Sequence, residues 1–228
     1  MTTPSKSPGR AEPRRKPLSR DQVLRAAMRL ADEGGLEAIS MRKLGQVLGV
    51  EAMSLYKHVA NKDDILDGIV DLVTEDFEVP APGEPWKTAI RRSSISARAV
   101  LLAHPWASSL IESRSSAGPA RMRYLDSVVG ALSAAGFPMP IVAQAVMALD
   151  SHTYGFVLQE LAWPFDPESA PDAAGAFAEG LQPGAYRNLA AMAEFVAASP
   201  GGTVADFTFG LDLILDGLGR LLREADAD

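Results

Sequence analysis

The sequence predicts an all-α protein with two parts: a small N-terminal three-helix domain that contains a helix-turn-helix, and a larger helical C-terminal domain. Apolar residues recur every three or four positions along most of the chain, as they do on one face of a helix. No alternating pattern of useful length indicates a strand, and no internal repeat is present. Three prolines between positions 80 and 85 interrupt the helical pattern. We therefore expect domains at 18–79 and 86–228, joined by a Pro-rich linker at 80–85.

The charge of the chain is divided between the same two parts. The 228 residues contain 22 Lys and Arg, 29 Asp and Glu and no Cys, which gives a formal charge of −7. That total excludes a uniformly basic packaging protein, and the missing Cys exclude a disulfide-stabilised secreted module and a Cys-ligated zinc finger. Residues 1–62 hold 12 basic and 6 acidic residues, a charge of +6, whereas the rest of the chain holds 10 and 23, a charge of −13. A basic end on an acidic protein favours contact with nucleic acid through that end alone.

The first 17 residues are polar, basic and rich in proline. We expect residues 1–17 to form a disordered basic arm, whose positive charges either contact DNA or only keep the chain soluble. The arm lacks the apolar segment of a secretory signal, and no run in the chain reaches the roughly 18 apolar residues of a membrane span. These features predict a cytoplasmic protein with no membrane partner.

The N-terminal helices are recognised by their ends. Ser19 and Gln22 have the spacing of a capping box, and Gly34 and Gly35 end the helix that follows. The next expected elements are a helix at about 40–48, a turn at 49–50, a helix at about 51–58 and a helix that begins at Asn61.

The C-terminal part reads as a series of longer helices. They are predicted at about 86–103, 105–112, 118–135, 139–162, 184–197 and 203–225. The segment 164–184 is rich in Pro, Ala and Gly, and we expect a loop with one helical turn around 173–179. The last helix has a second apolar row, formed by Phe209, Leu213 and Leu215. Either both apolar sides lie in the core of one subunit, or one of them contacts a second copy.

Residues 36–62 carry the strongest functional signal. Two short helices joined by a Gly-containing turn have the form of a helix-turn-helix. The second of these helices presents Ser54, Lys57 and His58 on its polar side. Small residues allow a helix to approach a DNA groove closely, and hydrogen-bonding and basic residues contact base edges and phosphates. The segment therefore predicts binding of double-stranded DNA.

A string of residues within this segment is specific to one family: Ser40-Met41-Arg42-Lys43-Leu44, Leu48-Gly49-Val50, Leu55-Tyr56-Lys57-His58-Val59 and Asn61-Lys62. In these residues the segment resembles the DNA-binding domain of the tetracycline-repressor (TetR) family. The C-terminal part resembles the tetracycline-repressor branch at 79–86, 135–137 and 210–218. The likeness covers almost all of residues 18–225. It implies a transcriptional regulator, most often a repressor that a small hydrophobic or aromatic effector releases from a palindromic operator.

The resemblance also implies roles for residues of the helix-turn-helix. Arg42 would contact a base, most readily guanine through two hydrogen bonds. The other implied DNA contacts are Ala52, Met53 and Ser54 in the major groove, and Ser40, Met41, Tyr56, Lys57, His58 and Lys62 mostly along the phosphate backbone. Two alternatives stay open: Tyr56 packs in the core of the domain, or His58 is an ordinary surface histidine.

The C-terminal part would bind the effector. In the tetracycline repressors, histidines hold the drug as a metal chelate, and alignment places Glu75, Leu110 and approximately Ser151 at those positions. We therefore expect a more apolar pocket with no metal and no other cofactor. The predicted effector-binding residues are Ser93, Ala97, Leu110, Ser113, Val128, Val146, Met147, Asp150 and Ser151. Asp150 and His152 either bind the ligand or form structural polar contacts.

The resemblance implies a homodimer built mainly from the helices at about 139–162 and 203–225, and the two apolar sides of the last helix agree with it. No catalytic residues are predicted, because the three histidines lack metal-type spacing and the chain has no nucleophile elbow or phosphate-binding loop. The alternative function is that of a DNA-binding architectural or partner-regulated factor without a small-molecule effector.

Overall fold

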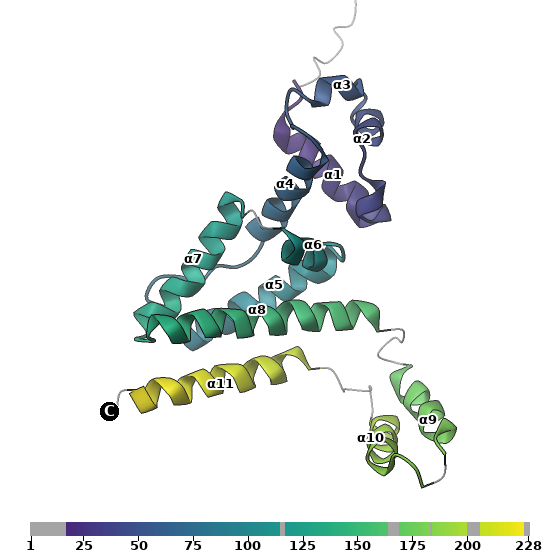
Figure 1. Cartoon of the computed structure of the whole chain (residues 1–228), viewed down its shortest axis with the longest axis vertical. Coiled ribbons are helices and arrows are strands. Elements are labelled where there is room, and N and C mark those ends of the chain that lie inside the picture. The colour runs from purple at the N-terminus through teal and green to yellow at the C-terminus, as the bar shows by residue number, and fades with distance from the viewer. Residues whose placement is uncertain (1–16, 115–116, 164–168, 183, 200–205, 226–228) are drawn as a thin grey trace, which may run out of the picture.

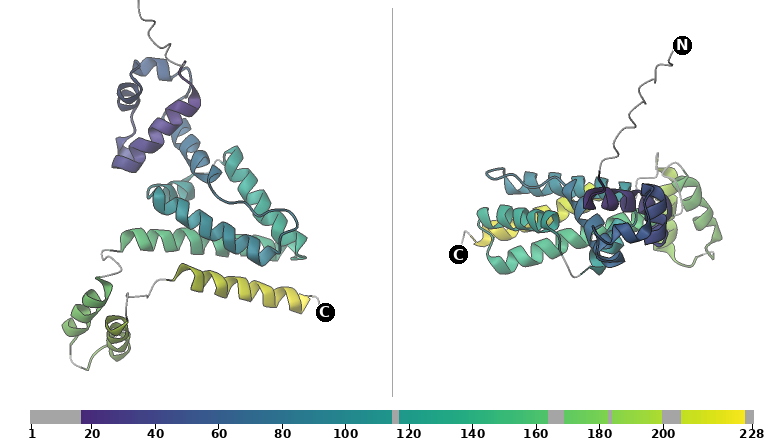
Figure 2. Two further views of the ribbon diagram at one scale, coloured as in Figure 1. Left: turned by 180° about the vertical axis from the view of Figure 1, so that it is seen from behind. Right: turned by 90° about the horizontal axis from the view of Figure 1, so that it is seen from above.

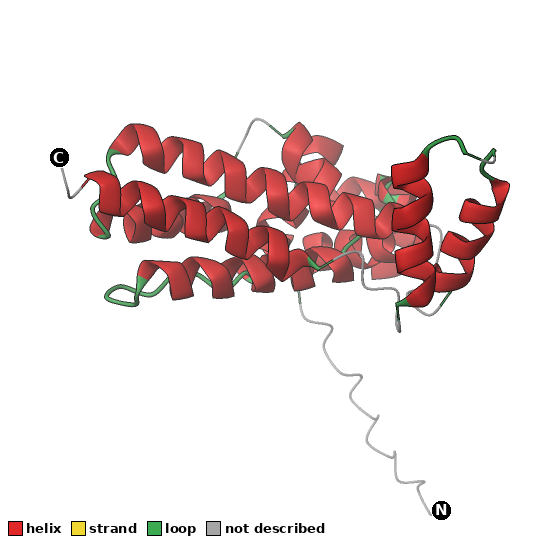
Figure 3. Cartoon of the chain, turned by 90° about the horizontal axis from the view of Figure 1, so that it is seen from below, coloured by secondary structure: helices red, strands yellow, loops and turns green. Residues whose placement is uncertain are grey.

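A computed structural model of the chain describes residues 17–114, 117–163, 169–182, 184–199 and 206–225. Every regular element in these ranges is a helix, so the predicted all-α fold is confirmed (Figure 3). No described helix is both long enough and apolar enough to cross a membrane. The predicted basic arm, apart from Pro17, and the first residues of the segment predicted at 203–225 lie outside the described ranges.

The N-terminal region, which we call the head, forms one end of the molecule (Figure 1). Its elements are α1 (Arg20–Gly34), the 3-10 helix η1 (Leu36–Ala38), α2 (Met41–Leu48), α3 (Ala52–Leu55) and α4 (Lys62–Glu75). The predicted capping box is confirmed, because the Ser19 side chain accepts from the Gln22 backbone and the Gln22 side chain accepts from the Ser19 backbone. The helix predicted at 51–58 is shorter than expected and is followed by turn residues.

The C-terminal region, which we call the body, contains seven described helices. They are α5 (Trp86–Ala103), α6 (Ala107–Ser113), α7 (Pro119–Ala134), α8 (Met139–Ala162), α9 (Ala170–Gly180), α10 (Arg187–Ala198) and α11 (Phe207–Ala225). The predicted bounds of α5 and α8 are confirmed. Helices α5, α7 and α8 pack together around the core of the body, and α11 packs against α5 and α8 (Figure 2).

The loop expected at 164–184 is partly wrong, because residues 170–180 form the eleven-residue helix α9. Ala has the highest intrinsic helix propensity, and the proline at position 171 lies in the first turn, where its missing N–H costs no hydrogen bond. Helix α9 packs against α10, and the two project from the rest of the body (Figure 1).

The two apolar sides of α11 have different surroundings. Leu211 and Leu218 are buried in the body. On the other side of the helix, Phe209 is 67% exposed and Leu213 is 58% exposed. The prediction that Leu215 belongs to this exposed row is wrong, because Leu215 is fully buried. Four residues separate it from Leu211 and three from Leu218, so it shares their face of the helix.

Helix α4 connects the head to the body through its acidic residues. Asp67 accepts from Arg114 Nε at 2.5 Å, and Asp71 Oδ1 accepts from the backbone N–H of Ala120 at 2.8 Å, at the start of α7. A second contact joins α1 to the loop before α6, where Asp32 accepts from Trp106 Nε1 at 2.7 Å. The head is therefore attached to α6 and α7 by directed hydrogen bonds as well as by apolar packing.

Candidate DNA interface and effector cavity

The helix-turn-helix is shaped by two glycines and one cap. The Ser40 hydroxyl accepts from the Lys43 backbone N–H and begins α2. Gly49 ends α2 with φ 66°, in the left-handed region that glycine adopts without strain. At Gly45 an added Cβ would lie 2.8 Å from the Val50 carbonyl oxygen, so only glycine allows the turn to pack this closely on α2.

The predicted base-contacting residues lie at the starts of α2 and α3. Arg42 and Met53 are exposed, Met53 to 73%, while Ala52 and Ser54 are half-buried. The Ser54 hydroxyl donates to the Glu51 carbonyl at 2.7 Å, so its proton is already engaged within the chain. Large exposed side chains on a short helix, with smaller residues between them, form a surface that fits the requirement of a groove-binding helix.

The predicted phosphate-contacting residues have more varied surroundings. Tyr56 and Lys57 are exposed, so the alternative in which Tyr56 packs in the core is not the arrangement found. Met41 and His58 are half-buried. Lys62 Nζ is exposed but donates to the Leu36 carbonyl at 3.3 Å, so this ammonium already has one partner within the head.

An ion pair that the sequence interpretation missed holds the second half of the motif. Arg20 on α1 contacts both carboxylate oxygens of Asp64 on α4, at 2.6 and 2.8 Å, and also donates to the His58 carbonyl. Asp64 in turn accepts from the Ala60 backbone N–H at 2.7 Å. The Arg20 hydrogen bond keeps the pKa of Asp64 below its usual value. This cluster fixes the segment between α3 and α4 against α1.

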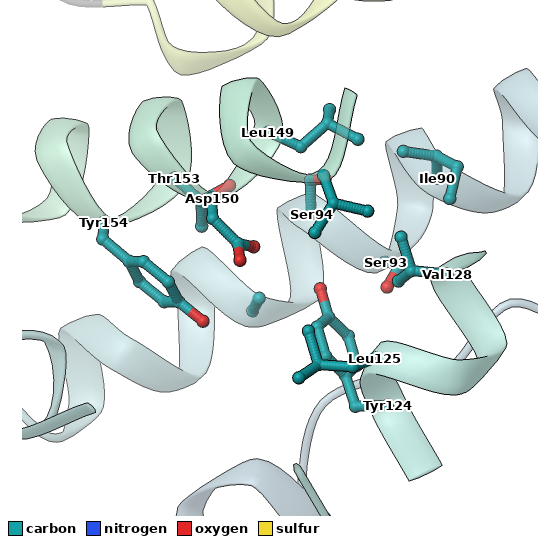
Figure 4. Close-up of a pocket in the computed structure, with 12 residues that line it drawn as sticks. Ile90, Ser93, Ser94, Tyr124, Leu125, Val128, Leu149, Asp150, Thr153 and Tyr154 are labelled. Atoms are coloured by element: carbon teal, nitrogen blue, oxygen red, sulfur yellow. The ribbon is translucent and has the colours of Figure 1, made fainter. Parts of the chain in front are cut away.

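The body encloses a narrow cavity between α5, α7 and α8 (Figure 4). Its free volume is about 10 Å³, enough for about one water molecule. The residues that line it are Ile90, Ser93, Ser94, Ala97, Tyr124, Leu125, Val128, Val146, Leu149, Asp150, Thr153 and Tyr154. Five of the nine predicted effector-binding residues are among them: Ser93, Ala97, Val128, Val146 and Asp150.

The other four predicted residues do not line the cavity. Met147 is 64% exposed and Ser151 is exposed, because each follows an inward-facing residue of α8 by one position and so points about 100° away from it. Leu110 is buried among other residues of the body core, and the Ser113 hydroxyl donates to the Leu110 carbonyl at the end of α6. As effector contacts, all four remain predictions.

Four of the cavity residues that the sequence did not indicate share a helix face with residues that it did indicate. Ile90 and Ser94 lie one turn from predicted residues of α5, and Tyr124 lies one turn before Val128 on α7. On α8, Tyr154 lies four residues after Asp150 and faces the same way. The sequence alone did not indicate which face of each helix lines the cavity.

The chemistry of the cavity is set by one carboxyl group and two phenols. The pKa of Asp150 is raised to about 6, mainly by burial and also by the nearby negative charge of Glu112, while the positive charge of Arg121 acts in the opposite direction. Burial also raises the pKa of Tyr124 to about 12 and the pKa of Tyr154 above its usual value. Both phenols are therefore neutral at physiological pH, and Asp150 is the titratable group of the cavity.

His152 has a structural contact of its own. Its Nε2–H donates to the Phe207 carbonyl at 2.9 Å, and its ring stacks on Phe207 with 4.9 Å between the centroids. At Gly210 an added Cβ would lie 2.5 Å from the His152 ring. Of the two alternatives for this histidine, the arrangement found is a structural contact between α8 and α11.

A helix-turn-helix head joined to a helical body with an internal cavity defines a DNA-binding transcriptional regulator. The chain belongs to the TetR family of such regulators. Residues 23–69 match the family model described as bacterial regulatory proteins, tetR family, and residues 79–222 match the one described as tetracyclin repressor-like, C-terminal domain.

Two curated relatives and one solved structure show how far this similarity extends. An HTH-type transcriptional regulator of Saccharopolyspora erythraea is 35% identical over 90% of this chain and 86% of its own length. The HTH-type transcriptional repressor DrrR1 of Streptomyces coeruleorubidus is 30% identical over 91% of this chain and 79% of its own. The structure of ActR from Streptomyces coelicolor in complex with actinorhodin has a TM-score of 0.76, at 27% identity, and covers 91% of this chain and 99% of ActR.

Proposed function

We propose that the protein is a homodimeric repressor that binds a palindromic operator through two heads and leaves it when a small hydrophobic or aromatic effector enters the body. The observation that carries this proposal is the position of the exposed residues Arg42, Met53, Tyr56 and Lys57. They lie on α2, on α3 and in the turn that follows, at the end of the molecule opposite α8 and α11 (Figure 1). A surface of this kind contacts DNA while the body remains free to bind a ligand.

The proposed dimer surface is formed by the outward faces of α8 and α11. These helices lie side by side, and both expose large apolar side chains (Figure 2). The exposed residues on these helices and at the end of α8 are Met139, Met147, Leu158, Leu161, Trp163, Phe209, Leu213 and Leu221. Burying such a stripe against a second copy is favourable by about 25 cal/mol per Å² of apolar surface. Two-fold symmetry would then present two heads to two half-sites.

The proposed route from effector to DNA runs through α7 and α4. The cavity is much smaller than the roughly 300–1,000 Å³ of ligand pockets, so an effector has to move α7 away from α5 and α8. Asp71 of α4 is bonded to the first backbone N–H groups of α7. An added Cβ at Gly118 would lie 2.3 Å from the Asp71 carboxyl carbon, so this junction is tightly packed. Movement of α7 would therefore change the position of α4 and of the head.

The relatives support an effector but do not identify it. ActR is a TetR-family protein of similar fold that was crystallised with actinorhodin, a small molecule. By analogy, we infer a small organic effector for this chain, no enzymatic activity, and a cytoplasmic location where the operator DNA is accessible.

The test is a gel-shift assay with DNA duplexes selected from a random pool by the full-length protein. The proposal expects a palindromic site that is bound by a dimer, and a half-site that is bound far more weakly. Failure to select any palindrome at low salt would reject it. A protein that binds the palindrome but is released by no member of a broad panel of aromatic metabolites would instead be the partner-regulated or architectural factor.

A further inference from the structure

Asp150 is a half-buried carboxylate at the wall of the cavity that the fold leaves without a cation. It lies in the middle of α8, and Figure 4 shows its carboxylate pointing into the same space as the hydroxyl groups of Tyr124 and Tyr154. Within the described parts of the chain, no hydrogen bond or ion pair to this carboxylate is found. Some other carboxylates of the body do form ion pairs: Asp212 with Arg91, and Glu160 with Arg98.

The charged groups around Asp150 do not neutralise it. Glu112 on α6 adds a second negative charge, and Arg121 on α7 is the nearby positive charge that favours ionisation. Arg121 Nη1 donates to the Ile111 carbonyl at 3.2 Å, so this guanidinium is held by the end of α6. The residues of α5 that reach the cavity are uncharged. Ionised Asp150 therefore remains a half-buried charge without a direct partner, and its partial removal from water is costly.

We infer that the effector carries a protonated amine on an apolar or aromatic body, and that Asp150 binds this ammonium group inside the cavity. This inference rests on the proposed effector control and names the chemical class of the effector. An ammonium group would supply the missing opposite charge and donate hydrogen bonds to the carboxylate. The hydroxyl oxygens of Tyr124 and Tyr154, which point into the same space, can accept further hydrogen bonds from the ammonium group, and the apolar part of the lining, including Leu125 and Val128, suits the rest of the molecule.

Other ligand classes fit this site less well. An anionic ligand would bring a second negative charge next to Asp150 and would bind only when this group is protonated. A neutral alcohol could donate one hydrogen bond but would leave the charge of the carboxylate uncompensated. The inference therefore predicts a definite order of affinity among ligands that share one apolar body and differ only in the polar group.

The experiment compares three probes with the same ring system: 1-naphthylmethylamine, 1-naphthalenemethanol and 1-naphthoic acid. Their affinities for the full-length protein are measured by isothermal titration calorimetry near neutral pH. The amine is expected to bind about tenfold or more tightly than the alcohol, as a charge-assisted hydrogen bond would require, and the acid most weakly. Equal affinities of amine and alcohol, tighter binding of the acid, or no binding of the amine would each overturn the inference.

Two variants then test whether Asp150 causes the preference for the amine over the alcohol. Asp150→Asn keeps the size of the side chain and should make amine and alcohol bind within about twofold of each other. Asp126→Asn removes the same charge from an exposed position of α7 and should keep the full preference for the amine. A preference that survives in Asp150→Asn, or one that disappears equally in both variants, would overturn the assignment to Asp150.

The pH dependence gives a check on the unmodified protein. Tyr124 and Tyr154 stay neutral across the acidic range, so Asp150 is the group of the cavity that titrates there. Binding of the amine should strengthen between about pH 5 and pH 7.5 as Asp150 loses its proton, whereas binding of the alcohol should change little. An amine affinity that is flat across this range would contradict the inference.

The outcome is separable from that of the proposed function. Binding of the selected palindrome is measured on the same preparations by gel shift, and Asp150→Asn should still bind it because Asp150 lies in the body. Palindrome binding without an amine preference would reject the inference and leave a DNA-binding regulator. Absence of palindrome binding would reject the proposed function, even if the amine binds.

Discussion

The head and the body place their polar groups differently. In the head, polar side chains are paired near the surface, as in the capping box of Ser19 and Gln22 and the ion pair of Arg20 and Asp64, while the core is apolar. In the body, polar groups lie inside: Asp150 faces the cavity, and the Ser108 hydroxyl is the buried side-chain group without a partner among the described residues. The head therefore has the character of a preorganised DNA-binding surface, whereas the stability of the body can change when a ligand binds.

This difference has an energetic basis. Hydrogen bonds and ion pairs made within the head add modest stability and remove conformational freedom, so its surface is preorganised before DNA arrives. The unpaired Asp150 carboxylate reduces the stability of the apo body, and a ligand that pairs with it in the cavity recovers that free energy. Changes in the head should thus impair DNA binding, and changes at the cavity should alter stability and effector response.

The largest expected effect is that of Leu55→Ala in the head. Leu55 is the buried residue of α3 and anchors this short helix to the core. Truncation should lower the free energy of unfolding of the head by about 2–5 kcal/mol and abolish binding to the selected palindrome. Urea unfolding and gel shift measure the two effects. Met122→Ala, at an exposed position of α7, should change stability by less than about 0.5 kcal/mol. A Leu55→Ala protein that binds the palindrome normally would contradict this account.

The next effect has the opposite sign and lies in the body. Moving the pKa of Asp150 from 3.8 to about 6 corresponds to roughly 3 kcal/mol of lost stability when the group is ionised. Asp150→Asn should therefore stabilise the apo protein at neutral pH by up to about this amount.

The pH dependence of that effect follows from linkage. Between the unfolded and the folded pKa of Asp150, the native state binds more protons than the unfolded state, so stability falls as pH rises from about 4 to 6. The penalty is absent below this range and complete above it. Urea unfolding at several pH values should show that Asp150→Asn lacks this fall, while Asp126→Asn retains it. A destabilised Asp150→Asn at neutral pH would mean that the carboxylate has a favourable structural role.

Arg42→Ala tests the DNA contacts of the head without changing its stability. Arg42 is exposed near the start of α2, so its removal should leave the unfolding free energy nearly unchanged. Affinity for the selected palindrome should fall by about 1–3 kcal/mol, with relaxed specificity at one base position. Arg123→Ala, at an exposed position of α7, removes the same charge from the body and should have a much smaller effect in the same gel-shift titration. Equal losses for both variants would point to a general effect of charge.

The head could be predicted in detail because its signals are local. The Ser19 cap and the left-handed turn at Gly49 each involve only residues within four positions along the chain. A local sequence pattern is therefore enough to predict them. The ion pair of Arg20 and Asp64 joins residues 44 positions apart, and no local pattern indicates it. The same reason explains why the sequence did not show that Lys62 turns to the Leu36 carbonyl.

The cavity was harder to predict because it depends on how helices are rotated against each other. Helix α8 is apolar around most of its circumference, so its sequence does not indicate an inward face. Val146 and Asp150 face the cavity, and Met147 and Ser151, one position further along, do not. The prediction of a loop at α9 was wrong for another reason. The proline and glycine residues of this segment indicated a loop, but its proline lies in the first turn, where a helix accepts it, and the alanines favour the helix.

The smallest expected effect is that of Gly130→Ala in the body, and the same substitution at Gly45 in the head provides the comparison. Gly130, on the exposed side of α7, has no atom within 4 Å of the position of an added Cβ. Gly130→Ala should therefore stabilise the body by about 0.5–1 kcal/mol through helix propensity alone. Gly45→Ala in the head adds the same methyl group 2.8 Å from the Val50 carbonyl oxygen, and should destabilise by about 1–3 kcal/mol and weaken palindrome binding. Urea unfolding of both variants reports the two signs. If both substitutions stabilise the protein, the turn between α2 and α3 adapts more easily than its packing indicates, and the head is not the preorganised surface described above.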